Sequence, residues 1–214
     1  MTHEQRVISG GTPTLRARDA GIGVGMRHCS RMKRVSVIGV SGSGKTTVAR
    51  RLSSVLDVPH LELDSLFHLP AWTPMPDEDF RRRVSEFVRG DRWVVDGNYA
   101  SHGVAEVVWP EADTIVWLDL PRSTVMRRVI ARTIRRAATR ETLWNGNREP
   151  WSNFFDPRPE KNIIVWAWTR HGPVRERYSR MSADGTWAHA RVERLDNQAQ
   201  VEAFHAGVAA GHRS

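Results

Sequence analysis

The residues from Gly39 to Thr46 read Gly-Val-Ser-Gly-Ser-Gly-Lys-Thr and fit the phosphate-binding pattern G-x-x-x-x-G-K-[ST] without a mismatch. Glycines allow the backbone to turn so that its N–H groups converge on phosphate oxygens, and a following helix adds its positive N-terminal end. In this pattern Lys45 reaches the β- and γ-phosphates, and the Thr46 hydroxyl can bind magnesium. The residues predicted to bind the nucleotide are Gly39, Ser41, Gly42, Ser43, Gly44, Lys45, Thr46 and Thr47.

Two apolar segments that are typical of buried strands, 93–95 and 114–118, each end next to an aspartate. A carboxylate that orients magnesium is expected on a strand beside the one leading into the phosphate loop. Asp96 is followed by a glycine that allows close approach of another group, so we predict that Asp96 joins Thr46 in the metal site, in the outer shell. Asp119 precedes Leu-Pro and is interpreted as the cap of the next helix, with a metal role as the alternative. A solvated strand end is the simpler explanation for either.

A third aspartate, Asp64, ends the predicted strand 60–63. In an open α/β sheet, substrates bind outside the carboxyl ends of the strands. A carboxylate in that position can accept the proton of a substrate hydroxyl, or orient the hydroxyl by a hydrogen bond. Asp64 is therefore a candidate general base, and an ordinary turn or cap aspartate is the alternative.

The predicted helix after Pro121 carries a stripe of arginines on one face, at the spacing i, i+4, i+7 and i+8: Arg128, Arg132, Arg135 and Arg136. Its apolar residues are expected on the opposite, core-facing side: Met126, Ile130, Thr133, Ile134 and Ala137. Because like charges on one face repel, the stripe favours an anionic partner, and the arginine fork matches a phosphoryl group in transfer. We therefore predict catalytic roles for Lys45, Arg128 and Arg132, with a solvated basic face as the alternative.

The segment after this helix is polar and aromatic. Arginines that could close over a nucleotide are Arg148, Arg158 and Arg170. The aromatic residues are Trp144, Trp151, Phe154, Phe155, Trp166 and Trp168. Packing of a small helical subdomain is the simplest explanation for these rings, and stacking on a base or closing a lid that excludes water is the alternative.

Strand-like and helix-like segments alternate along the rest of the chain, which predicts a parallel, doubly wound α/β sheet. Residues 1–32 are rich in Gly, Arg, Ser and Thr and predict a disordered extension, and residues 33–210 predict one domain with a lid insert at about 139–160. Further helices are expected from about 160 to 180 and around 201–208, and a last strand at 192–195.

The formal net charge of +8 is concentrated in residues 1–32 and 127–180, and the remainder of the chain is acidic. A local basic cluster attracts a local anion, and phosphate is the obvious one. The chain contains no apolar run of about 18 residues, which disfavours a membrane span. The single cysteine, Cys29, and the lack of a signal-peptide pattern lead us to expect a cytoplasmic protein.

With the phosphate loop, Asp96-Gly97-Asn98-Tyr99 and Arg128-x-x-x-Arg132 taken together, the chain resembles the adenylate-kinase-related P-loop kinases. It is most similar to the bacterial branch labelled DNA-topology modulation protein. The resemblance implies a P-loop NTPase fold with a five-stranded parallel sheet, a helical arginine-rich lid and transfer of the γ-phosphoryl group of MgATP. Adenylate kinases have Pro-Arg after the glycine, where this chain has Asn98-Tyr99, so the identity of the acceptor stays open.

The leading prediction is an ATP-dependent kinase for a small acceptor: a nucleotide, a nucleoside or a small hydroxyl metabolite. One alternative is a kinase for polynucleotide ends, which the basic segment would serve. Another is a nucleotide-regulated switch with weak ATPase activity. The acidic remainder of the chain argues against a broad nucleic-acid surface.

Overall fold

A computed structural model describes residues 32–148, 156–159 and 161–212. Its single sheet has five parallel strands in the order β2-β3-β1-β4-β5. The strands are β1 (Arg34–Gly39), β2 (His60–Glu62), β3 (Trp93–Asp96), β4 (Thr114–Leu118) and β5 (Arg191–Leu195). The predicted five-stranded parallel sheet is thus confirmed, and β1, which leads into the phosphate loop, lies at its centre.

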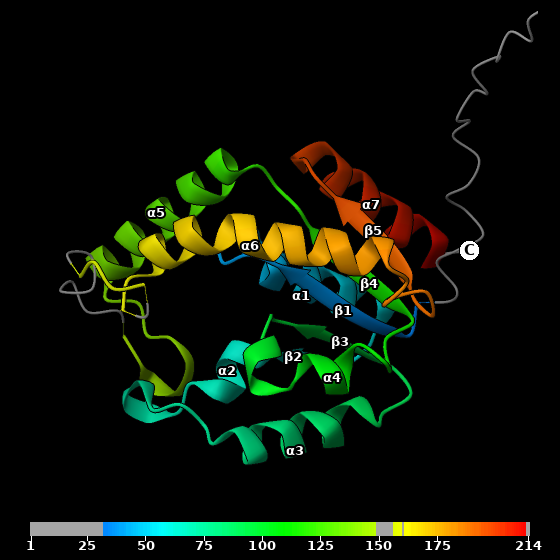
Figure 1. The fold of residues 1–214 in the computed structure, drawn as a ribbon, viewed down its shortest axis with the longest axis horizontal. Coiled ribbons are helices and arrows are strands. Elements are labelled where there is room, and N and C mark those ends of the chain that lie inside the picture. Colours follow the sequence, from blue (N-terminus) through cyan, green and yellow to red (C-terminus); the bar gives the residue numbers. More distant parts are fainter. Residues whose placement is uncertain (1–31, 149–155, 160, 213–214) are drawn as a thin grey trace, which may run out of the picture.

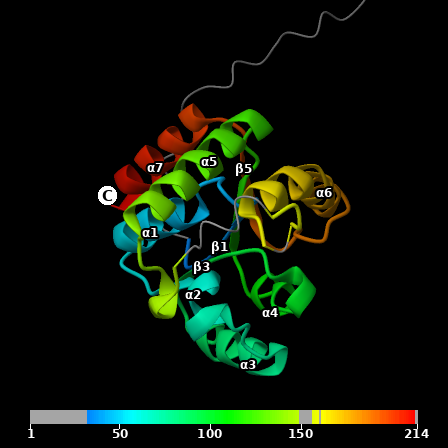
Figure 2. The ribbon, with the colours of Figure 1, turned by 90° about the vertical axis from the view of Figure 1, so that its left-hand side faces the viewer.

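Seven helices connect and cover these strands in the described part of the chain: α1 (Lys45–Leu56), α2 (Leu63–Phe67), α3 (Asp77–Val88), α4 (Ala105–Val108), α5 (Arg122–Thr139), α6 (Ile163–Ala183) and α7 (Gln198–His212). Helices α1 and α7 lie on one side of the sheet, and α4 and α6 lie on the other (Figure 2). From the far end of α5 the chain turns back and descends to the region of α2 (Figure 1).

The central strands are buried on both faces, which explains why they read as continuous apolar runs rather than as alternating ones. In β1, Val35 and Val37 face the core cluster under α1 and α7. Ile38 points to the second cluster, which contains Trp93 and Trp117. Because all five strands run in the same direction, their carboxyl ends meet along one edge, where the predicted site residues gather.

Several expected boundaries and faces differ from the structure. The second strand ends at Glu62, and Asp64 lies in the first turn of α2 instead of at a strand end. Helix α6 begins at Ile163, where Asn162 caps it by accepting hydrogen bonds from two backbone N–H groups. Met32, the last residue of the predicted extension, is buried in the core. Residues 1–31, including Cys29, lie outside the described residues, as do Trp151, Phe154 and Phe155.

The core-facing side expected for α5 is confirmed at Thr133 and Ala137 and wrong at Ile130 and Ile134. Its buried residues are Val125, Val129, Thr133 and Ala137. Ile130 and Ile134 are 39% and 49% exposed, so they do not face the core. Arginines 128, 132 and 136 lie beside the buried stripe rather than opposite it, because each precedes a buried residue by one position, a turn of about 100°. This rotation directs arginines toward the phosphate loop.

None of the helices in the described residues has both the length and the apolar character that crossing a membrane requires.

Candidate active site

The phosphate loop connects β1 to α1 and is closed by a hydrogen bond from the Ser43 N–H to the Val40 carbonyl, 3.1 Å long. Gly42 has φ +84°, and a Cβ there would lie 2.2 Å from Cγ2 of Val129 on α5. Only glycine fits this position, because a side chain would meet both a strained φ and a packed helix. The loop is thus pressed against the helix that carries the arginines.

Lys45, the first residue of α1, turns its ammonium group back over the loop, where Nζ donates to the Val40 carbonyl at 3.1 Å. Desolvation lowers the pKa of Lys45, and the negative charges of Asp64 and Asp96 oppose this shift. Ser43 Oγ is buried and has no hydrogen-bond partner among the described residues. A desolvated cation and an unsatisfied hydroxyl in one loop fit a bound phosphate, which would supply charge and acceptor oxygens to both.

Thr46 and Asp96 meet at the end of β3, where Thr46 Oγ1 donates to Asp96 Oδ2 at 2.7 Å. The other carboxylate oxygen of Asp96 lies 3.0 Å from His60 Nε2. Glu62 approaches the same hydroxyl at 3.4 Å and forms an ion pair with Arg50 at 2.9 Å. Hydroxyl and carboxylate oxygens suit magnesium, so Thr46 and Asp96 are the residues that would hold it. No group of three or more His, Cys, Asp or Glu side chains in the described part of the chain is arranged to hold a metal ion.

Helix α5 brings two of the predicted arginines to the loop. Arg128 donates to the Ser43 carbonyl at 3.0 Å and to Gln198 Oε1 at 2.6 Å. Arg132 Nη2 lies 3.4 Å from Ser41 Oγ. Thr47, which was also predicted to contact the nucleotide, is exposed on α1.

The other predicted arginines have partners away from the phosphate loop. Arg135 and Arg136 both pair with Glu141, at 3.1 and 3.8 Å. Arg158 pairs with the nearby Asp156, and the guanidinium of Arg170 lies over the Trp166 ring. The contact described for Arg148 is through its backbone carbonyl, which accepts a hydrogen bond from the Trp72 indole. The lid role predicted for Arg148, Arg158 and Arg170 stays a prediction.

Asp64 accepts a hydrogen bond from the Tyr99 hydroxyl at 2.7 Å. His68 Nε2 lies 3.4 Å from the same hydroxyl oxygen. Burial and the negative charge of Asp64 raise the pKa of Tyr99 well above its ordinary range, so the phenol keeps its proton. The Asn98 amide is hydrogen-bonded to the backbone of Gly39 in both directions and fixes the loop rather than a substrate.

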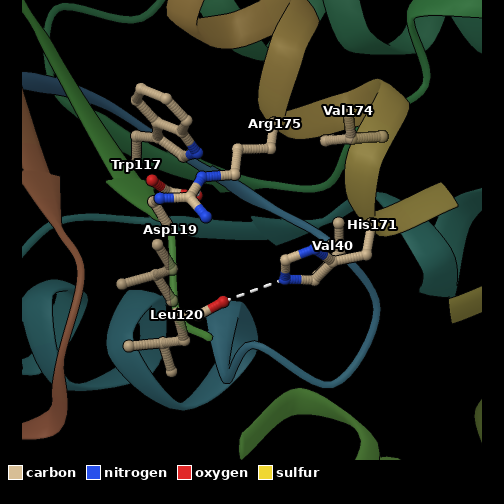
Figure 3. Close-up of a pocket in the computed structure, with 8 residues that line it drawn as sticks. Val40, Trp117, Asp119, Leu120, His171, Val174 and Arg175 are labelled. Atoms are coloured by element: carbon tan, nitrogen blue, oxygen red, sulfur yellow. Dashed lines mark hydrogen bonds and ion pairs between the residues drawn. The ribbon is translucent and has the colours of Figure 1, made fainter. Parts of the chain in front are cut away.

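Asp119 does not belong to this site, and it does not cap α5. The helix begins after Pro121 without a side-chain cap. Asp119 is buried and forms ion pairs with Arg175 at 3.2 Å and with Arg194 at 2.5 Å. It lines a small cavity on the α6 side, where His171 Nε2 lies 3.0 Å from the Leu120 carbonyl (Figure 3). Asp119 is thus a structural anion between β4, β5 and α6, and the prediction that it caps α5 was wrong.

Sequence reasoning missed His60, Glu62, His68 and Tyr99. Alternation along β2 places His60 and Glu62 on the same face of the strand, so the pattern His-x-Glu beside an acidic strand end was an available signal. His68 and Tyr99 are far apart in sequence, and the chain pattern gives no sign that they meet.

No family model matches the chain. A cytidylate kinase of Nitratidesulfovibrio vulgaris (strain DP4) is 40% identical over 50 residues, covering 23% of this chain and 22% of the relative. A shikimate kinase of Novosphingobium aromaticivorans is 31% identical over 110 residues, covering 44% of this chain and 57% of the relative. The matches thus span about a fifth and just over half of those two proteins.

A solved structure of shikimate kinase from Acinetobacter baumannii, in complex with shikimate, superposes with a TM-score of 0.51 at 15% identity. The match covers 83% of this chain and 91% of that chain. The chain therefore has the P-loop kinase fold and is related to P-loop kinases. These comparisons do not extend to the branch labelled DNA-topology modulation protein, so that finer resemblance stays a prediction.

Proposed function

We propose that the chain is an ATP-dependent kinase that transfers the γ-phosphoryl group of MgATP to a small acceptor. The observation that carries the proposal is the position of Lys45. Its ammonium group lies at the phosphate loop, 3.1 Å from the Val40 carbonyl, and the charges of Asp64, Asp96 and Arg132 all act on it. Cations for a terminal phosphate and a carboxylate for an acceptor hydroxyl therefore converge on one point, which is the arrangement that phosphoryl transfer needs.

Each residue has a distinct task in this proposal. The loop amides and Lys45 bind the phosphates, and Arg128 and Arg132 stabilise the negative charge that spreads over the transferred group. Asp64 accepts the proton of the acceptor hydroxyl while the oxygen of that hydroxyl forms a bond to the γ-phosphorus. The bond between the γ-phosphorus and the bridging oxygen breaks, and ADP is the leaving group. Magnesium held at Thr46 and Asp96 would neutralise charge on the phosphate oxygens. The relatedness to kinases named for cytidylate and for shikimate supports a small acceptor.

Calorimetry with MgATP, followed by an ADP-release assay over an acceptor panel, tests the proposal. The panel contains nucleosides, nucleoside monophosphates, sugars and DNA with free 5′-hydroxyl ends. We expect the wild type to bind MgATP and to release ADP faster with one class of small acceptor, and Lys45→Ala to abolish both. Lys33→Ala, at an exposed position next to β1, is the control with the same change in charge and should behave as wild type.

The remaining outcomes of these assays would favour other functions. ADP release that is indifferent to every acceptor would favour the nucleotide-regulated switch. Transfer to DNA ends alone would favour the polynucleotide kinase. Absence of MgATP binding, with no effect of Lys45→Ala, would refute all three.

A further inference from the structure

Two turns that are far apart in sequence, residues 69–73 and 143–147, are hydrogen-bonded to each other next to α2. We call these two turns together the clasp. Backbone hydrogen bonds from Leu69 to Thr73 and from Leu143 to Asn147 close the two turns, at 2.8 and 2.7 Å. Asn147, only 4% exposed, joins them. Its Oδ1 accepts from the Trp72 N–H at 2.9 Å, and its Nδ2 donates to the Leu69 carbonyl at 3.0 Å.

Further contacts fix the clasp in this position. The Trp72 indole donates to the Arg148 carbonyl at 3.0 Å, and the Asn145 amide donates to the His68 carbonyl at 2.6 Å. Ala71, Trp72 and Asn145 all have φ between +54° and +57°. Non-glycine residues hold this conformation only where the surrounding contacts enforce it, and such strain is typical of functional segments. The clasp thus joins the end of α5 to α2 in a defined geometry (Figure 1).

The clasp stacks Trp144 on His68, with ring centroids 6.0 Å apart and planes 21° from parallel. His68 in turn lies 3.4 Å from the Tyr99 hydroxyl, which is hydrogen-bonded to Asp64. On its other side, Trp144 lies 5.9 Å from the Arg136 guanidinium of α5. Trp144, stacked on His68, and Tyr99, whose hydroxyl contacts His68, therefore form a row of three aromatic side chains that ends at the candidate base, and we call this row the aromatic wall.

The aromatic wall is electrically neutral and has carboxylates next to it. Burial lowers the pKa of His68, which favours the neutral imidazole. Burial is the main cause that raises the pKa of Tyr99, and the charges of Asp64, Asp96 and Glu62 raise it further, so a negative potential acts on its hydroxyl. Arg136, next to Trp144, shares the carboxylate of Glu141 with Arg135, so the negative potential acts at the Asp64 end of the wall. A phosphorylated acceptor would be repelled there, whereas an uncharged ring could stack on the wall and present a hydroxyl to Asp64.

We propose that Trp144 and His68 determine acceptor specificity, and that the acceptor is an uncharged ring compound with a free hydroxyl, such as a nucleoside or a sugar, rather than a nucleoside monophosphate. This inference rests on the proposed kinase function and narrows its acceptor. Asn147 is a positioning residue, because it holds Trp144 against His68 through the turn of residues 69–73.

The test pairs adenosine, cytidine and D-ribose with AMP and CMP as probes. Binding to the protein loaded with a non-hydrolysable ATP analogue is measured by calorimetry, and transfer is measured with ATP. We expect the uncharged probes to bind and to accept phosphate. Trp144→Ala and Asn147→Ala should weaken their binding about tenfold with unchanged affinity for the ATP analogue. Trp144→Phe should restore most of the affinity, and Thr142→Ala, at an exposed position of the same segment, should have no effect.

The outcomes separate this inference from the kinase proposal. Uncharged probes that bind at the aromatic wall without formation of ADP would support the proposed acceptor specificity and contradict the proposed kinase function. Transfer to AMP or CMP at a higher kcat/KM than to adenosine or cytidine would support the kinase function and overturn the proposed preference for uncharged acceptors. Unchanged acceptor affinity in Trp144→Ala, or no binding of any uncharged probe, would also overturn the proposed role of the aromatic wall in acceptor specificity.

Discussion

The Thr46 hydroxyl and the Asp96 carboxylate are hydrogen-bonded at 2.7 Å, although 50 positions separate them in the chain. The contact exists because β3 is the parallel neighbour of β1, with Val37 paired to Asp96. The carboxyl end of β3 therefore opens beside the first turn of α1. His60 and Glu62 on β2 support the pair from the next strand. Strands β1, β2 and β3 thus position the predicted magnesium site.

Asp64→Asn is expected to lower kcat about 100-fold or more while leaving MgATP affinity unchanged, because the amide cannot accept the proton of the acceptor hydroxyl. The side chain keeps its shape and can still bind the Tyr99 hydroxyl, so the fold should persist. Steady-state kinetics and calorimetry on the same preparation give both quantities. Asp91→Asn, at an exposed position before β3, is the control. A variant with wild-type turnover would remove Asp64 from the chemistry.

Arg132→Ala is expected to lower kcat about a thousandfold, since this guanidinium approaches the phosphate loop at Ser41. Arg132→Lys should recover little of the activity, because lysine lacks the planar fork that matches a phosphoryl group. Arg127→Ala removes the same charge from an exposed position on the same helix. Equal losses in Arg132→Ala and Arg127→Ala would show that only the overall charge of α5 matters.

Gly42→Ala and Gly185→Ala form a matched pair, because their φ angles are +84° and +83°. Gly185 has open space around it, so alanine should cost about 1 kcal/mol there, from the backbone alone. At Gly42 the new methyl group meets Val129 on α5, which should add about 1–3 kcal/mol and weaken MgATP binding. Urea unfolding and calorimetry measure the two effects. Equal stability of the two variants would refute the packing of the loop against α5.

The lowered pKa of His68 leads to a prediction for how the free energy of unfolding depends on pH. Burial lowers its pKa below the 6.5 of the unfolded chain, so the unfolded state binds its proton first as the pH falls. The contribution of His68 to stability is therefore complete above pH 6.5 and is lost as the pH falls from 6.5 toward the folded pKa. Urea unfolding at about pH 7.5 and about pH 5.5 should show a smaller change in His68→Gln than in wild type.

His205 acts in the same direction, because its pKa is also lowered by burial. His205→Gln therefore serves as the comparison for the remaining slope. Identical pH dependence of the unfolding free energy in wild type and His68→Gln would contradict the assignment of His68 as a neutral, half-buried ring.

Sequence patterns were sufficient to predict the phosphate loop, the alternation of strands and helices, and the parallel sheet. These features depend on local physics: the backbone freedom of Gly42 and Gly44, the continuous apolar runs of β1, β3 and β4, and the periodicity of α1. The proximity of Asp96 and Thr46 could also be predicted, because the carboxyl ends of parallel strands lie along one edge of the sheet.

Which polar residues lie at that edge depends on long-range packing. Helical spacing shows which residues share a face of α5, but packing on the loop set its rotation, which exposed Ile130 and Ile134 and turned Arg132 inward. Asp119 resembled Asp96 in sequence, yet Arg175 and Arg194, from distant elements, neutralise it. The meeting of Trp144 with His68 depends on the clasp, whose hydrogen bonds join residues more than 70 positions apart. Such contacts arise from the energy of the whole fold, and no local pattern encodes them.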